Sequence, residues 1–120
     1  MARIALARHN GKTVCRHIPA RIKDLSTKEA CLEISNISPG TSHLFFDAQE
    51  GSSLVLVLEI DMASDPVLIL PARPQWFNSC EPENPYPFVM GISFPDLSSS
   101  QKKAIKLCIK RRRQQRLPEE

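Results

Sequence analysis

The sequence predicts an all-β fold, a small antiparallel β-barrel with a C-terminal helix that plugs or covers it. Turn-forming residues recur at short intervals, and the segments between them alternate apolar and polar side chains with the period of a strand. After Asp96 the period changes to that of a helix. The chain has 120 residues, which is the length of one domain and enough for one hydrophobic core.

Four segments have the composition of strands. Residues 30–37 alternate apolar and polar side chains, and residues 54–60 are an apolar run that suits a strand buried on both faces. Residues 67–70 are a short branched run after a turn, and residues 88–94 alternate strictly with period two. Several short strands at this spacing are typical of a barrel or a sandwich.

Glycine, proline and asparagine mark the reversals between these segments. Asn10 and Gly11 form a strong hairpin signal because both residues tolerate positive φ angles. Further turns are expected at residues 38–40, 50–52, 64–66 and 81–85. The strand that contains Pro74 is expected to be an edge strand or to carry a β-bulge, since proline donates no backbone hydrogen bond.

A single amphipathic helix is predicted at the end of the chain. Ser98 and Gln101 have the spacing of a capping box, in which each side chain bonds the backbone N–H of the other residue. An apolar stripe follows at helical spacing, formed by Ala104, Ile105, Cys108 and Ile109. The stripe ends around Arg111. We therefore expect one domain over residues 1–113 and a frayed polar tail over residues 114–120.

Charge is distributed unevenly along the chain. The net charge is +3, yet residues 101–120 hold eight of the sixteen basic side chains, while residues 1–100 carry eight basic and eleven acidic ones. Cations at this place suit the negative end of a helix dipole and exposure to solvent. Docking on an acidic partner or anionic lipid is the alternative. No aromatic residues are interleaved with these cations, so nucleic-acid binding is not expected.

No pattern in the sequence predicts a membrane span or export. The longest strictly apolar run has five residues, against the roughly 20 that a membrane-spanning helix needs. Between Arg3 and Arg8 lie four apolar residues, which are too few for the core of a signal peptide. A cytoplasmic protein is therefore expected.

Sequence motifs for catalysis or metal binding are missing. There is no P-loop, GxGxxG, HExxH or GxSxG motif. The four cysteines form no CxxC pair, and the three histidines have no zinc-like spacing. His17, Asp24 and Ser26 could be combined into a hydrolase-like triple, but sequence spacing assigns them no common geometry. We therefore predict no enzyme activity, no metal site and no cofactor.

The most specific constellation of polar residues follows the predicted strand 30–37. Asn36 and Ser38 present short donors and acceptors on one side of an extended chain, and Gly40 lets a ligand approach the backbone closely. Upstream, Arg16 and Arg21 flank a link stiffened by proline. A guanidinium group matches phosphate, and the O6/N7 edge of guanine, with two parallel hydrogen bonds. Together these residues predict a site for an anionic guanine nucleotide.

These motifs resemble those of the PilZ domain, the bacterial receptor module for cyclic di-GMP. Residues 36–41 resemble the D/NxSxxG motif of that family, and residues 70–76 resemble the strand that usually ends in an aromatic residue. Residues 91–94 match its late G-hydrophobic-x-F strand, directly before the helix. The resemblance extends over residues 16–110. It implies a six-stranded antiparallel barrel followed by a C-terminal helix.

The sequence departs from the family pattern in two motifs. The two arginines form RxxxxR where the family has RxxxR, and Thr41 stands where a last glycine is usual. A rival match to the second motif lies at residues 24–29, with Arg3 and Arg8 as its arginines. We prefer the later motif because it retains a glycine and leaves room for the usual strands.

The resemblance also implies a role for each residue of the predicted site. Arg16 and Arg21 would hold the phosphates and guanine edges of cyclic di-GMP. Asn36 and Ser38 would contact a base, while Gly40 would shape the loop. A stand-alone receptor that relays ligand binding to an effector protein by conformational change is therefore expected. The alternative is a PilZ-like adaptor that does not bind the nucleotide and acts through protein contacts.

Overall fold

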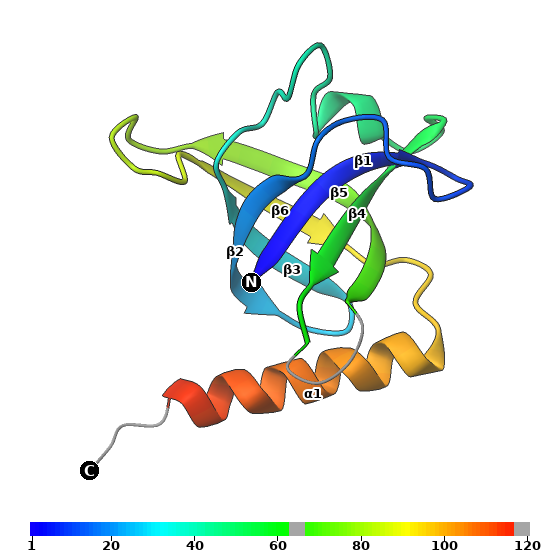
Figure 1. Cartoon of the computed structure of the whole chain (residues 1–120), viewed down its shortest axis with the longest axis vertical. Helices are drawn as coiled ribbons and strands as arrows, with labels where there is room; N and C mark the ends of the chain where they lie inside the picture. Colours follow the sequence, from blue (N-terminus) through cyan, green and yellow to red (C-terminus); the bar gives the residue numbers. More distant parts are fainter. Residues whose placement is uncertain (63–66, 117–120) are drawn as a thin grey trace.

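The structure, a computed structural model, describes residues 1–62 and 67–116, and this part forms a closed antiparallel barrel with one helix at its end (Figure 1). The elements in chain order are β1 (Ala2–Arg8), β2 (Ile18–Leu25), β3 (Glu29–Ile34), the 3-10 turn η1 (Phe46–Ala48), β4 (Leu54–Ile60), β5 (Leu68–Ser79), β6 (Phe88–Ser93) and α1 (Ser99–Arg116). Neighbouring strands follow the order β1-β2-β3-β6-β5-β4, and β4 pairs with β1 to close the barrel. The predicted barrel and C-terminal helix are confirmed. The expected turn at residues 64–66 and the tail residues 117–120 lie outside the described residues.

Strand β1 closes the barrel, although the sequence pattern did not predict it. It pairs with β4 along its whole length, from Ala2 opposite Ile60 to Arg8 opposite Leu54. Its pairing with β2 is much shorter and ends at Ala2 opposite Ala20. The rest of β2 therefore continues past the end of β1, on the side of the barrel that α1 covers (Figure 1).

Two strands differ in length from the prediction. β3 ends at Ile34 and does not continue to residue 37, because the chain turns at Asn36. β5 has 12 residues and extends far beyond the predicted segment 67–70. It continues through two prolines, and a β-bulge between Pro74 and Trp76 shifts its register against β6. Of the two alternatives predicted for this strand, the β-bulge is confirmed and the edge strand is wrong, since β5 pairs on both sides in the closed barrel.

Helix α1 begins with the predicted capping box. The Ser98 backbone N–H donates to Gln101 Oε1 at 2.8 Å, and the Gln101 N–H donates to Ser98 Oγ at 3.1 Å. The helix lies across one end of the barrel, where Ile105 and Cys108 are buried in the hydrophobic core (Figure 1). Its backbone remains helical to Arg116, through the first part of the predicted tail 114–120.

The core fills the barrel with aliphatic side chains from every strand. The largest fully buried side chains are Ile4, Leu6, Ile18, Leu32, Ile34, Leu44, Leu56, Leu58, Leu70, Met90, Ile92 and Ile105. Along each strand these residues alternate with outward-facing ones, as expected for a barrel of this size. Within the described residues, no helix has the length and apolar character needed to cross a membrane.

Candidate functional site

The barrel brings the two predicted motif segments to the same end of the β2–β3 pair. Ala20 pairs with Ile34, and one step further along, the Ser35 N–H donates to the Pro19 carbonyl at 3.3 Å. The segment that enters β2 and the loop that leaves β3 therefore start side by side. Arg16 lies on the first of these segments, and the predicted residues of the second motif lie on the other.

The 36–40 loop folds back on itself and is anchored in the core. Asn36 Oδ1 accepts the Ser38 N–H at 2.9 Å, which is an Asx turn. The buried Ile37 accepts a backbone hydrogen bond from Leu44, and Gly40 has a φ angle of +62°. The Asn36 side chain thus holds the turn, while Ser38 is exposed. The loop therefore presents one of its two predicted contact residues to solvent and uses the other to keep its shape.

Arg21 lies on the outer wall of the barrel and its guanidinium extends across β3. Its Nε is 3.6 Å from Oε1 of Glu33, the residue opposite it on β3. Its Cζ lies 4.1 Å from the ring centroid of Tyr86, which is a cation–π distance. Phe88 pairs with Ile34, so Tyr86, two residues before Phe88, lies at the end of β3 where the 36–40 loop begins. The guanidinium is thus directed toward the loop.

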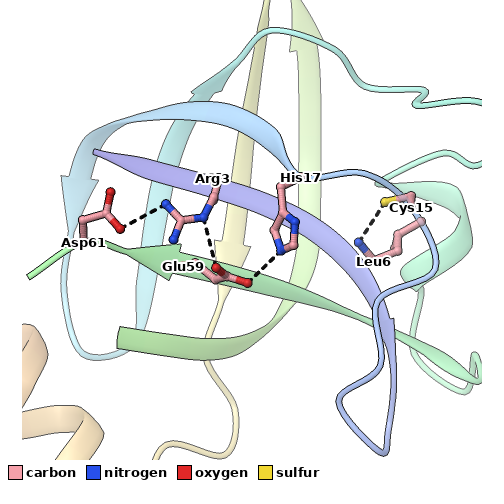
Figure 2. A network of polar contacts seen from close by, with 6 residues as sticks. All are labelled: Arg3, Leu6, Cys15, His17, Glu59 and Asp61. Atoms are coloured by element: carbon pink, nitrogen blue, oxygen red, sulfur yellow. Dashed lines mark hydrogen bonds and ion pairs between the residues drawn. The ribbon is translucent and has the colours of Figure 1, made fainter. Parts of the chain in front are cut away.

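Arg16 is an exposed residue between two anchored neighbours. Cys15 Sγ accepts the Leu6 N–H at 3.2 Å, and His17 Nε2 lies 2.8 Å from Glu59 Oε2 (Figure 2). These contacts fasten the backbone on both sides of Arg16 to β1 and β4. In the part of the chain that the structure describes, no hydrogen bond or ion pair connects either predicted arginine to the 36–40 loop.

Two residues of the rival motif match, Arg3 and Ser26, have structural partners. Arg3 donates to Glu59 at 3.0 Å and to Asp61 at 3.1 Å on the outer face of β1 and β4 (Figure 2). The hydrogen bond with Asp61 is the main cause that raises the pKa of Arg3. Ser26 Oγ accepts the backbone N–H groups of two later residues in the β2–β3 turn and donates to the Glu29 carbonyl. The Ser26 contacts therefore shape the turn between β2 and β3.

Two aromatic residues near the predicted site were not assigned to it from the sequence. Tyr86 lies between two prolines in a loop, and its N–H donates to Asn84 Oδ1 at 2.9 Å. Trp76 is 43% exposed and lies on the outer wall over Gly91, where a Cβ atom would overlap the indole ring. The resemblance of residues 70–76 to a strand that ends in an aromatic residue indicated Trp76. The position of Trp76 on the outside of the barrel depends on the bulge between Pro74 and Trp76. No local pattern indicates the contact between Tyr86 and Arg21.

A cavity of about 450 Å³ opens on the other side of Arg21, between β2 and the second half of α1. Arg21, Arg111 and Arg112 line it together with Asp61 and apolar side chains. Arg112 Nη2 donates to the Ile22 carbonyl at 2.7 Å, on the part of β2 that continues past β1. Among the described residues, no group of three or more His, Cys, Asp or Glu side chains is arranged to hold a metal ion.

We compared the chain with protein families, curated proteins and solved structures. No family model, no curated protein and no solved structure matches the chain. The resemblance to PilZ domains therefore depends on the short sequence motifs alone.

Proposed function

We propose that this domain binds cyclic di-GMP on the outer wall of β2 and β3 and relays the binding to an effector protein. The observation that carries the proposal is the position of the Arg21 guanidinium, which crosses β3 to Tyr86 at the end where the 36–40 loop begins. The closed six-stranded barrel with a C-terminal helix is also the fold that the resemblance implies. Cyclic di-GMP is a bacterial second messenger, so the proposal includes a cytoplasmic location.

The present partners of Arg21 are weak enough for a phosphate to replace. An exposed ion pair such as that with Glu33 contributes about 0.2–1 kcal/mol, and its length of 3.6 Å places it toward the lower end. A hydrogen bond to a charged group contributes about 1.5–3 kcal/mol, and a bidentate guanidinium–phosphate pair makes two of them. Tyr86 can remain stacked on the guanidinium plane, because the N–H groups point outward from its edge.

Arg16 would couple the ligand to a conformational change. Its neighbours Cys15 and His17 hold the segment against β1 and β4 through one contact each. A ligand that attracts Arg16 toward the 36–40 loop would bind more tightly to a state in which the segment has moved. That difference in affinity between two states is what a relay to an effector requires.

The same contacts of Arg21 favour a second candidate function, an adaptor that does not bind the nucleotide. In this case Glu33 and Tyr86 fix Arg21 as part of the wall, and the domain acts through protein contacts.

Calorimetric titration with cyclic di-GMP tests the proposal. The wild-type protein should bind, and Arg16→Ala and Arg21→Ala should each lower the affinity about 5- to 150-fold, since each removes about 1–3 kcal/mol of guanidinium contacts. Glu33→Gln should raise the affinity a few-fold by removing the competing carboxylate. Lys102→Ala is the matched control, because it removes one exposed cation at the other end of the barrel.

The outcomes separate the two candidates and the rival motif. Absence of heat with the folded wild-type protein at high ligand concentration would exclude the receptor and favour the adaptor. Loss of binding in Arg8→Ala but not in Arg21→Ala would transfer the site to the rival match.

A further inference from the structure

Helix α1 carries a charge opposite to that of the rest of the chain. Its 18 residues include eight basic and no acidic side chains. Residues 1–98 carry eight basic and eleven acidic side chains. The molecule therefore has an excess of positive charge at one end of an otherwise mildly acidic barrel. Basic side chains stabilise the C-terminal end of a helix, but this effect is confined to about the last turn. It therefore does not account for the lysines in the first half of α1.

The exposed face of α1 combines lysines with one exposed leucine. Ile105 and Cys108 are buried against the barrel. Lys103, Lys106 and Lys110 are exposed, and at 100° per residue they lie on the opposite face of the helix. Leu107 lies among them and is 39% exposed. We call these four residues, Lys103, Lys106, Leu107 and Lys110, the outer face.

Because Ile105 and Cys108 face the barrel, the outer face is turned away from it, and α1 itself forms one end of the molecule (Figure 1). The helix has 18 residues and lies across the end of the barrel (Figure 1), and the four residues of the outer face are exposed. Such a face can lie flat on an extended surface without the barrel interfering. An exposed end of this shape and charge fits an extended anionic surface as its partner.

We propose that the outer face docks the protein on an anionic lipid bilayer. The lysine ammonium groups would lie among the phosphate groups of the lipids, and Leu107 would enter the boundary between headgroups and acyl chains. The acidic barrel would be repelled from the same surface, which orients the molecule with α1 against the membrane. This docking is peripheral and does not involve the site proposed for cyclic di-GMP.

The composition of the outer face favours a lipid surface over nucleic acid. The outer face has lysine as its polar residue type and presents no asparagine or glutamine, the residues that recognise adenine. A bilayer removes the exposed part of Leu107 from water, while a phosphate backbone would leave it hydrated. Lysine is also a flexible point charge that does not need a fixed phosphate geometry.

Cosedimentation with vesicles tests the proposal. The full-length protein should bind vesicles that contain about 30% phosphatidylglycerol in phosphatidylcholine, and not pure phosphatidylcholine, at about 0.1 M salt, and higher salt should release it. The Lys103→Ala, Lys106→Ala, Lys110→Ala triple variant should bind about 100-fold more weakly, since each lysine near an anionic surface contributes about fivefold. Leu107→Ser should reduce binding several-fold without changing its salt dependence.

A second triple variant controls for net charge. Lys12→Ala, Lys23→Ala, Lys28→Ala removes three exposed lysines from the barrel and should leave vesicle binding nearly unchanged. Circular dichroism and thermal unfolding verify that each variant is folded. Equal losses in the two triple variants, or no binding of the wild-type protein to anionic vesicles, would overturn the proposal. Displacement of bound protein from the vesicles by equimolar duplex DNA would identify nucleic acid as the partner and would also overturn it.

Discussion

Arginines on two sides of the barrel have different surroundings. On the β1–β4 side, Arg3 donates to Glu59 and Asp61 at 3.0 and 3.1 Å. On the β2–β3 side, Arg21 has a 3.6 Å ion pair with Glu33 and rests on Tyr86. The first arginine already has two well-placed carboxylates, whereas the second retains donors for an anion. The number and distance of the carboxylate partners, more than the residue type, therefore distinguish a structural arginine from one that is available to a ligand.

Removing Arg3 should have the largest effect on stability. Arg3→Ala removes the guanidinium that Glu59, whose side chain is 16% exposed, shares with Asp61, the residue that follows β4. We expect the free energy of unfolding to fall by about 2 kcal/mol, since hydrogen bonds to charged groups are involved and part of the network is exposed. Urea denaturation measures this change, with Arg8→Ala as the control on the same strand. If the free energy of unfolding falls by less than about 0.5 kcal/mol, the contacts of Arg3 with Glu59 and Asp61 do not stabilise the fold.

Gly91→Ala should have the next largest effect, on the outer wall where β5 and β6 pair. The added methyl group would overlap the Trp76 indole, which must move outward because the strand cannot. Since Trp76 is partly exposed and can move, we expect a loss of about 1 kcal/mol, at the low end of overpacking costs. Tryptophan fluorescence should shift to longer wavelength. In the presence of Trp76→Ala, the second substitution should cost nothing further, and an equal cost there would show that the clash is elsewhere.

His43 is a group whose pKa the fold lowers. Its Nδ1 accepts the N–H groups of Phe45 and Phe46 at 3.1 Å, and its ring contacts Phe46 and Phe77. Burial lowers the pKa of His43. The unfolded chain therefore binds a proton at higher pH than the folded one, so stability should fall as pH falls below about 6.5 and on through the lowered pKa.

His43→Asn isolates this contribution. The amide oxygen of asparagine can accept the same backbone hydrogen bonds but does not titrate. The variant should lose some stability at about pH 7.5 through the missing ring contacts, and its stability should change less between pH 7.5 and about 5.5 than that of the wild type. Thermal unfolding at the two pH values measures the difference. An unchanged pH dependence would show that another group causes it.

Local signals were sufficient for much of the fold. The capping box at Ser98 and the bulge at Pro74 each depend on a few neighbouring residues, and both were predicted. Strand β1 was missed although Ile4 and Leu6 alternate with outward-facing residues, because several of its residues are alanines, which have little preference for strands. Its pairing with β4 is a long-range contact that the local sequence does not encode.

In the candidate site too, local sequence predicts the turns but not the contacts between distant residues. The Asx turn at Asn36 and the positive φ of Gly40 follow from residue type and short spacing. The stacking of Arg21 on Tyr86 depends on the register of β2 with β3 and of β3 with β6. Two registers must be known before these residues can be placed together, and a one-residue shift in either would move one of them to the other face.

Arg21→Ala should have the smallest effect on stability, and it is the sharpest test of the comparison. The substitution removes one long ion pair and one exposed cation–π contact, which together contribute no more than about 1 kcal/mol at the surface. Glu33 then remains with access to water and needs no new partner. We therefore expect the free energy of unfolding in urea to fall by about 0.5 kcal/mol, well below the change for Arg3→Ala. A loss as large as that for Arg3→Ala would make Arg21 a structural residue and would favour the adaptor over the receptor.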